Sequence, residues 1–68
     1  MEDNARQDIR RLLKSFGIQA DEVIMAHLAQ QAPGTVLQLR VVLADVTDYG
    51  DNPPATPLKL EIEGEVRG

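Results

Sequence analysis

The residues best suited to bind a metal ion lie close together in the second half of the chain. Four carboxylate or amide side chains fall within eight residues: Asp45, Asp48, Asp51 and Asn52. Oxygen ligands of this kind suit Ca²⁺ or Mg²⁺, but the spacing lacks the alternating ligands, central glycine and final glutamate of an EF-hand. Asp and Asn are also common in turns, because their side chains hydrogen-bond their own backbone. We therefore predict a turn here, with no metal and no cofactor.

The only tyrosine of the chain, Tyr49, belongs to the same segment. An exposed aromatic ring close to the rigid Pro53 and Pro54 is typical of residues that anchor a protein interface. The ring could equally fold back and cover the core, and the sequence leaves both arrangements open. We predict that Tyr49, Asp48 and Asp51 contact a partner protein.

A row of basic residues, Arg6, Arg10 and Lys14, is spaced i, i+4, i+8 near the N-terminus. On a helix these side chains share one face and could bind an anion such as phosphate. Asp8 and the net charge of −4 oppose a strong positive field, so a solvated helix face is the favoured interpretation. The three residues remain the candidates for anion binding.

Catalytic groups are sparse. His27 is the only histidine, Ser15 the only serine, and cysteine is absent. A catalytic histidine needs a nucleophile or an orienting carboxylate within reach, and no motif supplies one. Three glutamates share one side of an expected strand, but nothing encloses them to raise a pKa: Glu61, Glu63 and Glu65. We predict a protein that is not an enzyme, with no catalytic residues.

Two short helices are expected to position these groups. Asn4 and Gln7 resemble a capping box, and the apolar residues that follow recur at i, i+3, i+4 and i+7. Gly17 stands where a left-handed residue would end the helix, so the first helix is predicted over 4–15. A second helix is predicted to begin within 20–22 and to end at Pro33-Gly34, with its apolar stripe formed by Val23, Ile24, His27 and Leu28.

The pattern then changes to strict alternation, which predicts strands over 36–46 and 58–66. Three prolines and a glycine between them predict a loop of about ten residues. Gly64 falls on the apolar side, where a bulge or a closely approaching helix is the usual reason for a glycine. The expected fold class is α+β: one domain over 1–68, with two N-terminal helices packed on a long antiparallel β-hairpin.

Two helices followed by a hairpin also resemble a winged helix-turn-helix, which binds nucleic acid. The second helix would then read the bases, yet it begins with Asp21 and Glu22 and carries no Arg or Lys. Recognition helices normally present basic or amide side chains at that end. Nucleic-acid binding therefore stands as the less favoured alternative.

Size points toward association with another chain. A 68-residue chain buries little core, and without cysteine it has no disulfide to compensate. An isolated hairpin is marginal in water, and its open edges invite pairing. The outer side of the first strand is also more apolar than solvent requires, through Val36, Val42, Ala44 and Val46. We predict an acidic adaptor or homodimer whose sheet is completed by dimerisation, with Val42 and Val46 in contact with the partner.

The sequence shows no apolar stretch of the length needed to cross a bilayer and no signal-peptide pattern at its N-terminus. We therefore expect a cytoplasmic protein without membrane contact.

Overall fold

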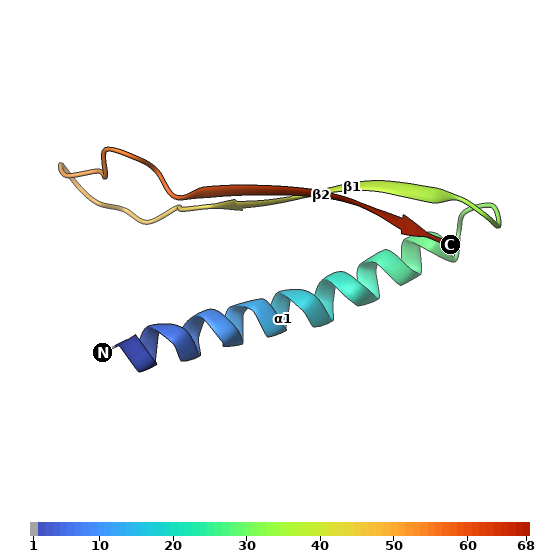
Figure 1. Cartoon of the computed structure of the whole chain (residues 1–68), viewed down its shortest axis with the longest axis horizontal. Helices are drawn as coiled ribbons and strands as arrows, with labels where there is room; N and C mark the ends of the chain where they lie inside the picture. Colours follow the sequence, from blue (N-terminus) through green and yellow to red (C-terminus); the bar gives the residue numbers. More distant parts are fainter. Residues whose placement is uncertain (1) are drawn as a thin grey trace. The chain divides into compact units, whose positions relative to one another are not determined.

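The structure is a computed structural model that describes residues 2–68. Its elements are one helix, α1 (Glu2–Leu28), and two strands, β1 (Val36–Ala44) and β2 (Lys59–Arg67) (Figure 1). The chain divides into a helical unit that ends at Thr35 and a hairpin unit that begins at Val36. The α+β class and the antiparallel hairpin are as the sequence predicts.

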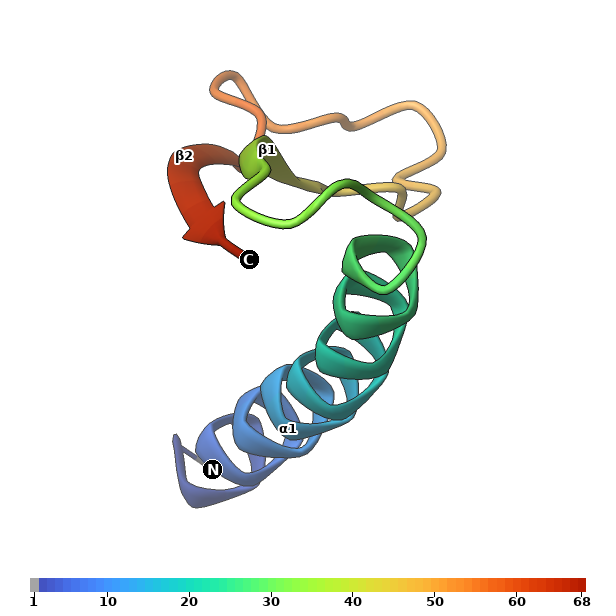
Figure 2. The same ribbon diagram turned by 90° about the vertical axis from the view of Figure 1, so that its right-hand side faces the viewer.

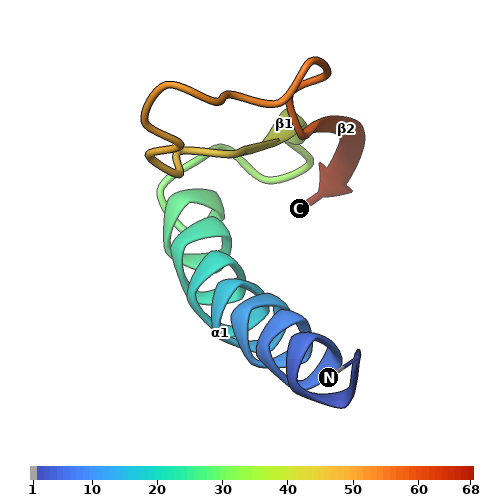
Figure 3. The same ribbon diagram turned by 90° about the vertical axis from the view of Figure 1, so that its left-hand side faces the viewer.

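The prediction of two helices is wrong. α1 is one helix of 27 residues that passes through the expected link at 17–19 without a break, as Figures 2 and 3 show from two further sides. Asn4 therefore lies inside the helix and does not cap it. Only Gly34 and Gly50 have positive φ in the described chain, so Gly17 does not adopt the left-handed conformation that would end a helix.

The physical reason is the weak effect of a single glycine among good helix formers. Glycine in a helix interior costs about 1 kcal/mol relative to alanine, which the Arg, Leu, Lys, Ala and Glu residues around it can offset. Gln19 also donates from Nε2 to Ser15 Oγ at 2.9 Å, bridging the position of Gly17. Phe16, the last residue of the first predicted apolar stripe, lies seven residues before Val23, the first residue of the second, so the two stripes join in phase as one.

After α1 the backbone hydrogen bonds change from a four-residue to a three-residue spacing, and the chain then turns. Ala29 still donates to the carbonyl of Met25, whereas the next two amides bond three residues back, as is common at a helix end. A turn follows in which Thr35 N–H donates to Ala32 O at 3.2 Å. Pro33 and Gly34 occupy its centre, and the φ of +85° at Gly34 identifies a type II turn.

The hairpin has a continuous register from Val36 opposite Arg67 to Ala44 opposite Lys59. Both strands lie within two residues of their predicted bounds. Of the two arrangements that the sequence left open at Gly64, a bulge is absent, because Gly64 pairs directly with Leu39 and the register does not slip. A Cβ placed on Gly64 would meet no atom within 4 Å.

Burial is described for residues 3–68, and none of their side chains is buried. The apolar residues of α1 are among the exposed ones, with Phe16 at 49% and Val23 at 68%. No helix in the described chain has the length and apolar character needed to cross a membrane.

Candidate interaction surface of the hairpin

One face of the hairpin, which we call the inner face, is entirely apolar. Alternation along both strands and the observed register place seven apolar side chains and Gly64 on it: Leu37, Leu39, Val41, Leu43, Leu60, Ile62 and Val66. The central cross-strand pair, Val41 and Ile62, is 41% and 54% exposed. Such a continuous apolar surface is what a sheet buries against another layer.

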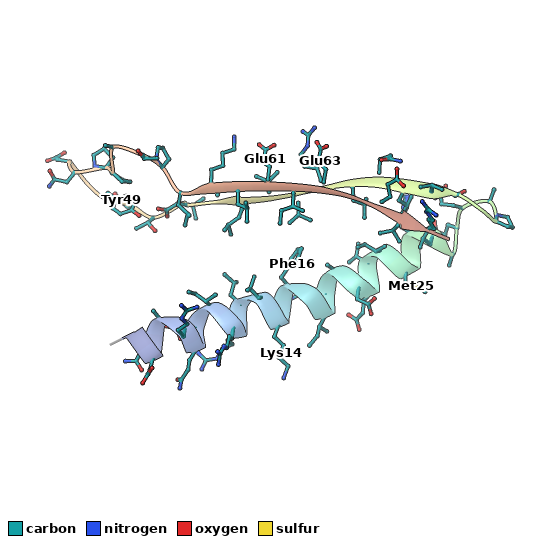
Figure 4. The ribbon with its side chains drawn as sticks, viewed as in Figure 1. Lys14, Phe16, Met25, Tyr49, Glu61 and Glu63 are labelled. Atoms are coloured by element: carbon teal, nitrogen blue, oxygen red, sulfur yellow. The ribbon has the colours of Figure 1, made fainter. Side chains whose placement is uncertain are left out.

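The opposite, outer face carries the charges of the hairpin. Arg40 Nη2 lies 3.2 Å from Glu63 Oε2, and Gln38 Nε2 donates to Glu65 Oε2 at 3.0 Å. Glu61 pairs with Lys59 along the same strand at 3.3 Å. Glu61 and Glu63 project from the same side of the ribbon (Figure 4). These exposed pairs add little stability, about 0–1 kcal/mol each, but they fix which face meets water.

The outer face is apolar only along β1, where Val36 and Val42 are 44% and 52% exposed. Val42 lies opposite Glu61, and Ala44 lies opposite Lys59. Val46 lies beyond the end of β1 and is 94% exposed. The predicted contact residues Val42 and Val46 are therefore both even-numbered, as are all the outer-face residues of β1. Only Val42 lies within β1, and Val46 lies two residues past its end.

Each strand has one edge without a backbone partner in the described chain, because the sheet has two strands. Asp45 N–H donates to Leu58 O at 3.3 Å, so these opposed residues form a hydrogen-bonded pair. Antiparallel pairs alternate, so the odd-numbered residues of β1 bond β2. The even-numbered residues, Val36 to Ala44, direct their N–H and C=O groups to the free edge.

The loop after β1 is held by its own side chains. Asp45 accepts from Thr47 N–H at 2.9 Å and from the hydroxyl of Tyr49. Asp48 accepts from Gly50 N–H at 2.9 Å, and Asn52 N–H donates to Tyr49 O at 3.2 Å. Gly50 has a φ of +64°, which the second position of a mirror-image turn requires.

These contacts shift two pKa values in opposite directions. Hydrogen bonds from the Thr47 side chain, the Tyr49 hydroxyl and the Thr47 amide hold the pKa of Asp45 below its usual value. The hydrogen bond between Tyr49 and Asp45 raises the pKa of Tyr49, because Asp45 accepts it from the neutral phenol. The hydroxyl of Tyr49 is held by its hydrogen bond to Asp45. The residue is 44% exposed, so part of its surface faces solvent.

Asp48 and Asp51 are the other predicted contacts in this loop. Asp48 serves a local turn, and Asp51 occupies the third position of the Tyr49–Asn52 turn. In the part of the chain that the structure describes, no group of three or more His, Cys, Asp or Glu residues is placed to hold a metal ion.

The basic row lies on α1. Because the helix is continuous, Arg6, Arg10 and Lys14 share one side of it at intervals of four residues. Lys14 and Phe16 project from opposite sides of the helix (Figure 4). The neighbouring Arg11 is paired with Asp8 at 3.3 Å. The row is therefore a polar side of an amphipathic helix, separate from the apolar stripe.

Comparison with protein families, curated proteins and solved structures finds no match to this chain. Sequence reasoning missed two features of the hairpin, the Arg40–Glu63 pair and the Asp45–Tyr49 hydrogen bond. Strand parity could have indicated the first, whereas no sequence signal indicates the second.

Proposed function

We propose that this chain is a small, non-enzymatic interaction module that associates with a second copy of itself through its β-hairpin. The observation that carries the proposal is the inner face, whose seven apolar side chains include none that is buried. Burying a Val, Leu or Ile side chain fully contributes about 1.5–3 kcal/mol. A second copy that pairs with an open strand edge buries part of that surface, because it brings the apolar side chains of the two copies side by side on one face of the sheet.

The loop supports the proposal as a further contact surface. Three prolines and the bonds made by Asp45 and Asp48 restrict its backbone, so little entropy is lost when a partner binds it. The exposed part of the Tyr49 ring is then available as an anchor.

Sedimentation over micromolar to millimolar concentrations tests the proposal. We expect a species of twice the 7.5 kDa chain mass that dissociates on dilution. A monomer at every concentration would overturn it.

A matched pair of variants tests the part played by the inner face. Leu43→Gln on β1 and Lys59→Gln on β2 place the same side chain on opposite faces of the hairpin. We expect Leu43→Gln to weaken association at least about tenfold, equivalent to about 1.4 kcal/mol, and Lys59→Gln to leave it nearly unchanged. Equal effects of the two substitutions would count against the inner face.

A further inference from the structure

The two free edges of the hairpin differ in charge, which indicates where a second strand can add. On β2 the outer-face positions are nearly all charged: Lys59, Glu61, Glu63, Glu65 and Arg67. On β1 the same face holds a single charge, Arg40, among Val36, Gln38, Val42 and Ala44. Glutamates along an edge are a common means of preventing strand addition.

Twofold pairing of β2 with its copy would oppose like charges. In an antiparallel pair about a twofold axis, the numbers of facing residues have a constant sum. Only an even sum lets the outward backbone groups of the two copies meet, and every even sum that overlaps more than half of β2 places one glutamate directly opposite another, such as Glu61 opposite Glu63 of the second copy. Like charges in directly opposed positions destabilise a strand pair.

Pairing of β1 with its copy avoids this conflict when Val41 lies on the twofold axis. Arg40 then faces Val42 of the second copy, and Leu39 faces Leu43 on the inner side. Centring the pair on Arg40 would instead oppose two arginines. The axis at Val41 also places Val36 opposite Val46, which gives the highly exposed Val46 an apolar neighbour.

The backbone agrees with this register. Val36, Gln38, Arg40, Val42 and Ala44 direct their amide and carbonyl groups to the free edge, as the Asp45–Leu58 bond shows. With the axis at Val41, even-numbered residues face even-numbered residues, so Arg40 and Val42 of opposite copies can exchange both hydrogen bonds. Val41 then forms a non-hydrogen-bonded pair with its own copy.

We propose that the free edge of β1 pairs antiparallel with β1 of a second copy about an axis at Val41, giving a four-stranded sheet in the order β2–β1–β1–β2. This inference rests on the proposed self-association and specifies its edge and register. β2 becomes the outer strand on both sides, and its glutamates keep the sheet from growing further.

Cysteine cross-linking tests the edge, because the chain has no cysteine of its own. Val41→Cys and Ile62→Cys form a matched pair, since these β-branched residues face each other on the inner side. In the proposed sheet the two copies of residue 41 have Cα atoms about 4.5 Å apart, within disulfide reach. The two copies of residue 62 are three strand spacings apart, roughly 14 Å.

Under mild oxidation we expect Val41→Cys to form a covalent dimer and Ile62→Cys to remain largely uncross-linked. Cross-linking of Ile62→Cys alone, or of both variants equally, would overturn the β1 edge while leaving self-association intact. A dimer in sedimentation without cross-linking of Val41→Cys would do the same. A monomer in sedimentation would instead overturn the proposed function itself.

A second pair of variants blocks each edge separately. Val42 and Glu61 are opposed residues whose N–H groups both point away from the hairpin, so proline at either position removes no bond between β1 and β2. We expect Val42→Pro to weaken dimerisation at least tenfold and Glu61→Pro to leave it within about twofold. The reverse order would assign the interface to β2. Circular dichroism of both variants confirms that the hairpin and helix are retained.

Discussion

Leu39 and Gly64 lie directly opposite each other at the middle of the inner face, so that one strand presents a large side chain and the other none. A Cβ on Gly64 would meet no atom within 4 Å, and the backbone there has no positive φ. Glycine in a strand interior costs stability, because the unfolded chain loses more entropy and no side chain packs.

We expect Gly64→Thr to stabilise the protein by about 0.5–1 kcal/mol, since a β-branched residue fits an extended strand better than glycine does. The denaturant midpoint at a fixed protein concentration measures the change. A lower midpoint would show instead that another surface occupies the space above Gly64 in the assembled protein. Sedimentation of the variant would then also show weaker association.

The continuity of α1 at Gly17 gives a second prediction. Gly17 has ordinary helical φ and open space around it, whereas Gly34 has a φ of +85° in the turn that follows α1. We expect Gly17→Ala to stabilise the helix by about 1 kcal/mol and Gly34→Ala to destabilise the protein by about 1–2 kcal/mol. Thermal unfolding followed by circular dichroism distinguishes them. A destabilising Gly17→Ala would argue for a break in α1 at that residue.

The same glycines show how far sequence patterns could predict this fold. Alternation located both strands to within two residues, because period-two patterning follows directly from strand geometry. The predicted break between two helices at Gly17 was wrong, because glycine is compatible with both a helix interior and a helix end. Only the φ angle of the residue distinguishes the two. The phase of the apolar stripe, continuous from Phe16 to Val23, was the signal that favoured one helix.

The candidate surface was predictable to a similar extent. The alternation of side chains along a strand predicted that Val36 and Val42 lie on the outer face. The observed register agrees, because it pairs both residues with charged outer-face residues of β2. The Asp45–Tyr49 hydrogen bond was not predictable, because it depends on the loop backbone and on the positive φ of Gly50. Local propensity identifies a turn but does not specify which side chains meet across it.

The lowered pKa of Asp45 predicts that acid loosens the loop. A carboxylate with a folded pKa below its unfolded value of about 3.9 stabilises the folded state above that value, and this contribution is lost as pH falls through the folded pKa. We expect the Thr47 amide and Tyr49 ring resonances to shift together below about pH 4. Nuclear magnetic resonance across an acid titration measures this.

Asp45→Asn is the control, because asparagine keeps an oxygen acceptor for the Thr47 amide but does not titrate. The acid shift of Thr47 should disappear in it, and the raised pKa of Tyr49 should fall toward its ordinary value, seen in the ultraviolet absorbance of the phenolate. An unchanged Tyr49 titration in Asp45→Asn would show that the hydrogen bond does not persist in solution.

The glutamates of β2 provide the last prediction, which concerns what limits assembly. If they keep a second strand from adding at that edge, neutralising all three with Glu61→Gln, Glu63→Gln and Glu65→Gln should open it. Both edges of the hairpin could then pair, so sheets would extend beyond two chains. We expect sedimentation to show species larger than a dimer that grow with concentration.

The control variant removes three negative charges from the helix instead, through Asp8→Asn, Asp21→Asn and Glu22→Gln. Both variants therefore change the net charge from −4 to −1. A general loss of charge repulsion would enlarge the assemblies of both variants equally. An edge-specific effect enlarges only those of the β2 variant, since only there do the lost charges face an incoming strand. A β2 variant that remains a dimer would show that the glutamates do not limit assembly.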